Sequence, residues 1–165
     1  MIPQIKKILF ATDLSKNSAY AFFYAIHMAK RDDAKIIILH AVEPIAPMLV
    51  NFEDFKHQVA KDRWEEAVIK FKEQIQDISV KADARTGVSS VDFISNILIR
   101  LGNPVEEILR VADEEDCDVI ILGSHGKGLL EQTLLGSVSS SVLLRTRKPV
   151  FVIPLPSKNI NLDLI

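Results

Sequence analysis

The fold class is decided by the stretch Leu122-Gly-Ser-His-Gly-Lys-Gly-Leu-Leu-Glu-Gln-Thr-Leu-Leu-Gly-Ser137. It follows an apolar run, residues 118–122, that is typical of a buried strand, and it precedes residues 138–146, which we predict to be helical. Its glycines therefore lie between the end of a strand and the start of a helix. An α/β protein can bind phosphate there, because free backbone N–H groups and the helix dipole both point outward. Taken singly, each glycine could also serve only to make a turn, and Ser137 only to cap the helix.

Working outward, apolar strands alternate with amphipathic helices along the chain. We expect strands at residues 5–11, 34–42, 92–101, 118–122 and 150–153. We expect helices at residues 16–30, 55–78, 104–115 and 138–146, the third of them introduced by Asn103 and Pro104. Residues 79–90 are polar and rich in turn formers, so they could hold a short helical extension or a mobile loop.

This alternation predicts a single α/β domain, residues 1–154, with a tail at 155–165 outside its core. We expect an open, doubly wound parallel sheet of five strands in the order 3-2-1-4-5, with helices on both faces. The winding then reverses between strands one and four, and ligands bind at the carboxyl ends of the strands there. Those ends carry Ala11-Thr12-Asp13 and Gly123-Ser124-His125-Gly126, so Asp13 and the glycine-rich stretch should face one crevice.

Composition narrows the class of protein. The 165 residues are 48% hydrophobic and 25% charged, with a net charge of −2, which gives no reason to expect a nucleic acid or an anionic membrane as a partner. No apolar run approaches the ~20 residues that span a bilayer, and the N-terminus lacks a signal-peptide layout. Cys117, the single cysteine, fits a reducing cytoplasm and is expected to be a buried, unreactive thiol.

The glycine-rich stretch differs from the two common nucleotide loops. It lacks the Gly-Lys-Ser/Thr ending of a Walker loop, and no Gly-x-Gly-x-x-Gly follows the first strand. Its own spacing is Gly123-x2-Gly126-x9-Gly136-Ser137. This spacing resembles the ATP-binding signature of the universal stress protein family. Similar segments cover most of the chain, leaving residues 45–91 and the tail as divergent parts: Lys7-Ile-Leu-Phe-Ala-Thr-Asp13, Leu39-His-Ala41, Gly102-Asn-Pro104, Asp118-Val-Ile-Ile-Leu-Gly-Ser-His-Gly126 and Lys148-Pro-Val-Phe-Val-Ile153.

The resemblance implies a Rossmann-like fold of the adenine nucleotide alpha hydrolase type and a set of nucleotide-binding residues. It assigns the phosphates and ribose to Gly123, Gly126, Gly136 and Ser137, with Val138 and Ser139 beside them. It assigns the adenosine end to Asp13, the backbone of Ala41 and a base pocket lined by Leu122. Lys127 could reach a phosphate, although a solvated loop lysine is as good an interpretation. Ala11 stands where ATP-binding relatives often have proline, which should loosen the base pocket slightly.

The histidines carry no catalytic or metal-binding pattern. We expect His27 and His40 in the core or at its margin, His57 at the surface, and His125 in the loop, where it could orient the backbone. No nucleophile–base pair and no metal-ligand spacing is recognisable. Asp13 could also cap the first helix.

The resemblance therefore implies an ATP-binding regulatory or stress-response protein, using Mg²⁺ and at most slow hydrolysis, and a homodimer through the final strand, Val150–Ile153. Two alternatives remain open. One is an ATP-using enzyme of the same superfold, a pyrophosphatase or adenylyl transferase, although residues 11–15 contain no glycine for a phosphate loop. The other is a dimeric scaffold that contacts a partner through residues 45–91.

Overall fold

The sheet of the computed structural model has the predicted parallel order. The structure describes residues 3–43, 53–125 and 135–154, with the backbone alone for 53–60. Its strands form one sheet in the order β3-β2-β1-β4-β5, and every pair of neighbours is parallel. They are β1 (Lys7–Ala11), β2 (Lys35–Val42), β3 (Ile94–Leu101), β4 (Val119–Gly123) and β5 (Val150–Ile153). The predicted fold class is confirmed. The tail, 155–165, lies outside the described residues.

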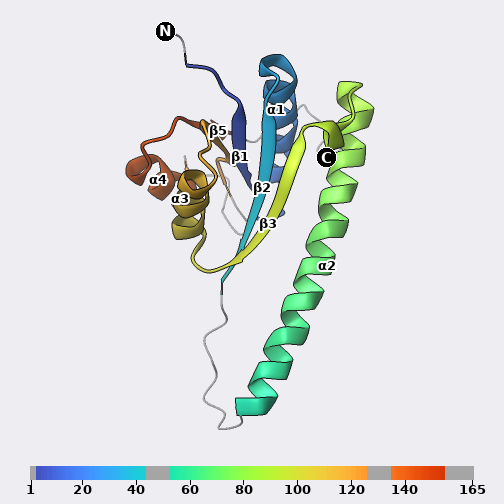
Figure 1. The fold of residues 1–165 in the computed structure, drawn as a ribbon, viewed down its shortest axis with the longest axis vertical. Helices are drawn as coiled ribbons and strands as arrows, with labels where there is room; N and C mark the ends of the chain where they lie inside the picture. The colour runs from blue at the N-terminus through green and yellow to red at the C-terminus, as the bar shows by residue number, and fades with distance from the viewer. Residues whose placement is uncertain (1–2, 44–52, 126–134, 155–165) are drawn as a thin grey trace.

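Helices cover both faces of this sheet (Figure 1). They are α1 (Lys16–Asp32), α2 (Glu53–Thr86), α3 (Pro104–Glu114) and α4 (Ser137–Arg145). Side chains alternate along each strand, so neighbouring residues enter different cores. Phe10 and Ile38 pack with α1 and α2 in one core, whereas Leu9 and Leu39 pack with α3 and α4 in the other.

The helix α2 is longer than expected, because it continues through most of the segment that the sequence left open. The buried face continues past Ile75 to Ser79 and Ala82, and the helix ends only at Thr86. A 3-10 turn, Ser90–Asp92, follows, and it delays the start of β3 to Ile94. The helical-extension alternative is thus the correct one. The N-terminal half of α2 extends beyond the end of the sheet (Figure 1).

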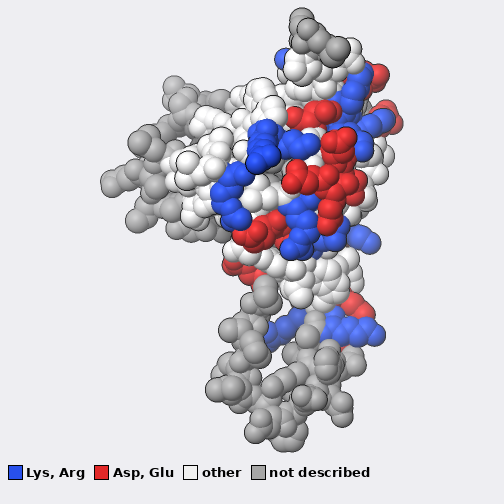
Figure 2. Space-filling view, turned by 60° about the vertical axis from the view of Figure 1, so that its left-hand side comes forward, with Lys and Arg blue, Asp and Glu red and all other residues white. Residues whose placement is uncertain are grey.

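Within the described ranges, no helix combines the length and the apolar character needed to cross a membrane. On the face of the molecule in Figure 2, basic and acidic side chains are intermixed rather than gathered into one large patch of a single sign.

Candidate functional site

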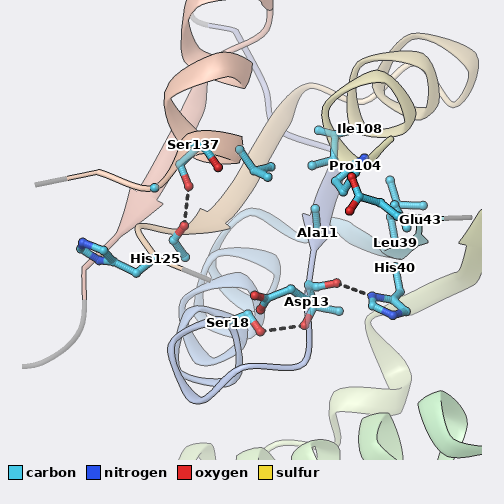
Figure 3. A pocket seen from close by; sticks show the side chains of 16 residues that line it. Ala11, Asp13, Ser18, Leu39, His40, Glu43, Pro104, Ile108, His125 and Ser137 are labelled. Atoms are coloured by element: carbon cyan, nitrogen blue, oxygen red, sulfur yellow. Dashed lines mark hydrogen bonds between the residues drawn. The ribbon is translucent and has the colours of Figure 1, made fainter. Parts of the chain in front are cut away.

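A cavity of about 570 Å³ opens at the carboxyl ends of β1, β2 and β4, where the winding of the sheet reverses (Figure 3). This is the crevice that the topology predicts. Its volume lies within the range of small-molecule sites. Besides the strand ends, its walls come from the first turns of α3 and α4 and from Ser18 of α1.

The first turn of α4 forms one end of the cavity. Gly136, Ser137, Val138 and Ser139 line it, and Gly136 is the N-cap residue, with no side-chain hydrogen bond to the turn. Ser137 is the first helical residue, so the alternative that it only caps the helix is wrong. Within the described part of the chain, no side chain caps this helix N-terminus. Its N–H groups and the positive end of the helix dipole form a combination that suits an anion.

Ser139 and a backbone bond of Gly136 tie this turn to the end of β4. The Ser139 hydroxyl donates to the Gly123 carbonyl oxygen at 2.7 Å, and this bond joins α4 to the end of β4. The Ser140 hydroxyl donates to the Gly136 carbonyl oxygen at 2.6 Å within the helix. The backbone N–H of Gly136 also donates to the Ser124 carbonyl oxygen at 2.7 Å. The start of α4 is therefore tied to the end of β4 by both side-chain and backbone bonds.

A tight turn after β1 presents Asp13 at the opposite side of the cavity (Figure 3). Leu14 has a left-handed backbone, with φ 65°, which is uncommon for leucine and is held here by its surroundings. The Thr12 hydroxyl oxygen accepts from the Leu14 N–H at 3.0 Å, and the Asp13 carboxylate accepts from the Ser15 N–H at 3.0 Å. Ser15, not Asp13, is the N-cap of α1, so the capping alternative for Asp13 is wrong.

The end of β2 supplies Leu39, His40, Ala41 and Glu43 to the cavity. His40 is half-buried, with its Nδ1 at 2.8 Å from the Thr12 carbonyl oxygen. Its ring stacks on Phe71 of α2, with centroids 5.0 Å apart and planes 14° apart. His40 thus lies at the core margin, as expected, and joins the cavity wall to α2. His27 is exposed on α1, which corrects its expected place in the core or at its margin.

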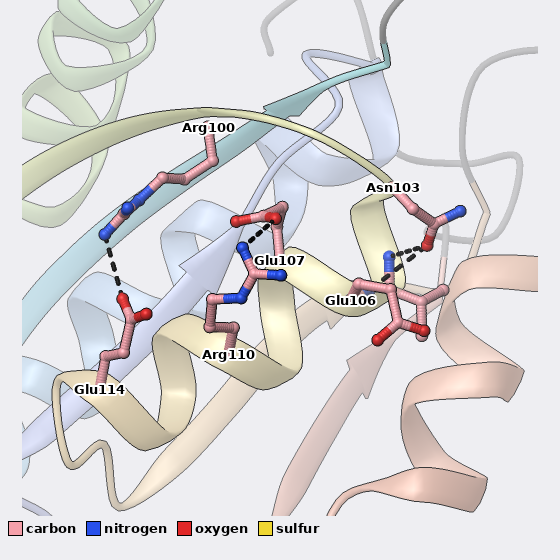
Figure 4. A network of polar contacts seen from close by, with 7 residues as sticks. Arg100, Asn103, Glu106, Glu107, Arg110 and Glu114 are labelled. Atoms are coloured by element: carbon pink, nitrogen blue, oxygen red, sulfur yellow. Dashed lines mark hydrogen bonds and ion pairs between the residues drawn. The ribbon is translucent and has the colours of Figure 1, made fainter.

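The helix α3 contributes an apolar wall through Pro104 and Ile108. Its start is fixed as predicted, because the Asn103 side chain accepts from the N–H groups of Val105 at 3.0 Å and Glu106 at 3.3 Å (Figure 4). Arg145 of α4 donates to Glu106 at 2.7 Å, which joins the two helices and lowers the pKa of that carboxyl group.

On the same helix, Glu107 is buried and accepts from Arg110 at 2.8 Å, and Arg100 of β3 pairs with Glu114 at 3.1 Å (Figure 4). The Arg100–Glu114 pair joins α3 to β3, whereas the Glu107–Arg110 pair lies within α3.

Most residues of the predicted site meet at this cavity, and some do not. The lining includes Ala11, Asp13, Ala41, Gly123, Gly136, Ser137, Val138 and Ser139. Leu122, expected in the wall of a base pocket, instead packs in the core with α3 and α4 and is not among the lining residues. Gly126 and Lys127 lie outside the described residues, as does the side chain of His57.

Sequence reasoning missed several residues at the site. Glu43 and Ser18 line the cavity without belonging to any recognised motif, and Asn17 supports it from behind. Pro104 was predicted as the first helical residue of α3 but not as part of a wall. Only their places in the sequence could have indicated these residues, because each of them follows the end of a strand or lies at the start of a helix.

Among the described residues, no three His, Cys, Asp or Glu side chains are grouped so as to hold a metal ion. Ser124 and His125 form a hydrogen bond of 2.7 Å, but Ser124 is buried and does not line the cavity. Cys117 is fully buried away from the cavity, and burial raises the pKa of its thiol to about 11, as expected of an unreactive cysteine.

Comparison with known proteins agrees with this architecture. The family model described as the universal stress protein family matches residues 4–154. Universal stress protein MJ0577 of Methanocaldococcus jannaschii is 29% identical over 90% of this chain and 94% of its own length, and MJ0531 of the same organism is 32% identical over 93% and 84%.

Solved structures show the same relationship. The structure of MJ0577 matches with a TM-score of 0.74 at 28% identity, over 94% of this chain and 100% of that one. A crystal structure of a universal stress protein in complex with cAMP matches with a TM-score of 0.60 at 23% identity, over 92% and 98%, which shows the shared fold. The chain belongs to the universal stress protein family.

Proposed function

We propose that this protein binds an adenine nucleotide, ATP with Mg²⁺, in the cavity and acts as a nucleotide-dependent regulatory protein in a stress response. One observation carries the proposal: the first turn of α4, which no described side chain caps, lines a cavity whose other side is formed by Asp13 and the end of β2. A phosphate-binding end and a polar end lie across one space, as a nucleotide requires.

This polarity also orients the ligand. Phosphates belong at the N-terminus of α4, because its N–H groups and dipole favour negative charge. Carboxylates such as Asp13 and Glu43 favour hydroxyl and amino groups, so the ribose and base belong at their end of the cavity. Pro104 and Ile108 offer an apolar surface for the base. The solved relative in complex with cAMP supports an adenine nucleotide in this fold.

The lining fits Mg²⁺ that arrives with the nucleotide better than a metal site built by the protein. Mg²⁺ keeps several waters and commonly takes one or two carboxylates together with substrate phosphates. Asp13 lies at the other end of the cavity from α4, and the described residues hold no group of three acidic, histidine or cysteine side chains, so the phosphates and water would hold the ion. The ion would supply charge neutralisation for the phosphates.

We propose that the protein hydrolyses ATP slowly at most. Among the described lining residues, the Asp13 carboxylate accepts from the Ser15 N–H, and the Ser139 hydroxyl donates to the Gly123 carbonyl oxygen. No described lining side chain is paired with a base as an activated nucleophile would be. These interactions favour binding of ATP over its rapid hydrolysis.

We further propose a homodimer through β5 and a cytoplasmic location. The strand β5 is an edge of the sheet, and Phe151 on it is 45% exposed. An apolar open edge is a template for pairing with another strand, which a second copy of the chain would satisfy. A free buried thiol such as Cys117 is typical of proteins in a reducing compartment.

Titration calorimetry with ATP and Mg²⁺ tests the nucleotide proposal, together with thermal unfolding at rising ATP. Ligand at 100 times Kd should stabilise the protein by about 2.7 kcal/mol. Gly136→Val should weaken ATP binding, since its side chain would stand at the phosphate end. Ala84→Val, on the exposed face of α2, is the matched control and should bind normally. Absence of any ATP response from the unaltered protein would reject the proposal.

A further inference from the structure

The side chain of Asn17 connects three segments behind the cavity. Asn17 is the second residue of α1 and is 4% exposed. Its Nδ2 donates to the Ile153 carbonyl oxygen at 3.1 Å. Its Oδ1 accepts from the His125 N–H at 2.8 Å and from the Ser124 hydroxyl at 3.4 Å. Both ends of this buried amide are therefore used.

The partners of Asn17 lie where β4 and β5 end. Ser124 and His125 follow β4 directly, and Ile153 ends β5. The Ser124 N–H also donates to the Ile153 carbonyl oxygen at 2.8 Å, and the Ser124 carbonyl accepts from the Gly136 N–H at 2.7 Å. The chain from Asn17 through Ser124 thus reaches Gly136, the N-cap residue of α4.

Asn17 does not line the cavity, so it can act on a ligand only through these neighbours. We infer that Asn17 is a positioning residue for the phosphate end of the site: it clamps the first residues after β4 against the end of β5 and so fixes the start of α4. This inference rests on the proposed nucleotide function.

The physical argument is one of preorganisation. Backbone N–H groups bind an anion well only when their direction is fixed before the anion arrives, and a supporting shell of hydrogen bonds sets that direction. Without the Asn17 side chain, the His125 N–H would lose its acceptor at 2.8 Å. The Ile153 carbonyl oxygen would keep the Ser124 N–H as a donor and lose the Asn17 Nδ2. The residues proposed for the adenosine end, Asp13, Ala41 and Pro104, are not among the hydrogen-bond partners of the Asn17 side chain, which are Ile153, Ser124 and His125.

The test compares ATP with adenosine in the full-length protein. Asn17→Ala should lower ATP affinity about five- to tenfold, the equivalent of one hydrogen bond, and change adenosine affinity less than about twofold. Ile26→Val, a core change in α1 away from the cavity, is the control for general loosening and should leave the ratio of the two affinities unchanged. Equal losses for both ligands, or no loss for either, would overturn the inference.

Hydrogen exchange on the unaltered protein gives a second measurement that needs no variant. Saturating ATP should slow exchange of the His125 and Gly136 amides, whereas adenosine should leave them unchanged. An unchanged His125 amide in the presence of bound ATP would overturn the inference and leave the proposed function intact. If the unaltered protein bound no ATP at all, the proposed function would fall as well, so the two failures are distinguishable.

Discussion

The hydroxyl of Ser139, in the first turn of α4, donates a hydrogen bond of 2.7 Å to the backbone carbonyl of Gly123, the last residue of β4. Ser139 is 5% exposed, so water cannot readily replace this bond. The bond spans the two ends of the segment that joins β4 to α4. It makes Ser139 a structural support of the start of α4, which we propose as the phosphate end of the cavity.

We expect Ser139→Ala to lower the free energy of unfolding by about 1–2 kcal/mol, because the Gly123 carbonyl loses a buried donor. Ser140→Ala is the matched control, since the Ser140 hydroxyl bonds only to the Gly136 and Ser137 carbonyl oxygens at the start of α4 itself. Alanine is the best helix former, so this control should change stability by less than about 0.5 kcal/mol. Urea unfolding of both variants measures the difference, and equal losses would contradict the role assigned to Ser139.

Gly123 is constrained by Asn17 as well as by Ser139. A Cβ atom on Gly123 would stand 3.1 Å from both Cγ and Oδ1 of Asn17 and 3.3 Å from its backbone carbon. We therefore expect Gly123→Ala to destabilise the protein by about 1–3 kcal/mol through overcrowding. In a background of Asn17→Ala the cost should fall by about 0.5 kcal/mol or more, because the crowded side chain is gone. Strictly additive effects in this double-mutant cycle would show that the two sites do not press on one another.

The thiol of Cys117 should make stability depend on alkaline pH. Burial chiefly, and then the negative charge of Glu115, raise its pKa to about 11 in the folded protein, against about 8.5 for a free thiol. Between these values the unfolded chain releases a proton that the folded chain keeps, so stability falls as pH rises from about 8.5 to 11.

Urea unfolding from pH 8 to pH 10.5 checks this dependence. Cys117→Ala removes the titrating group and should show a shallower decline, while lysines and tyrosines titrate in both proteins and cancel in the comparison. Parallel declines would contradict the assignment. At pH 8, the native thiol should react with a disulfide reagent only as fast as the protein opens.

Sequence reasoning reached the sheet and the two sides of the crevice because those depend on local pattern. Near-continuous apolar runs mark strands covered on both faces, and right-handed crossovers leave only a few possible strand orders. The helix start at Asn103 and Pro104 was equally local, and the structure confirms it. The end of α2 was harder to predict. Its buried face is completed by small residues such as Ser79 and Ala82, which do not continue the pattern of large apolar side chains.

The support of the site was out of reach because it is made of contacts between distant segments. Asn17 and Ile153 are 136 residues apart, and neither residue type predicts the hydrogen bond between them. Leu122 is on the same side of the sheet as Ala11 and Leu39, which line the cavity, but it is not among the lining residues. The sequence pattern indicates that side and does not indicate how far the cavity extends along the strand. Leu122 packs with α3 and α4 in the core.

The final strand offers the clearest test of the proposed homodimer. We expect Phe151→Glu to shift the protein toward monomer, because it places a charge on the open edge strand β5, where Phe151 is 45% exposed. Val80→Glu is the matched control: Val80 is 63% exposed on α2, so the same new charge should leave the assembly unchanged. Sedimentation equilibrium of the three proteins over a range of concentrations separates the outcomes. A monomer in the unaltered protein would reject the dimer, and a dimer that survives Phe151→Glu would move the interface away from β5.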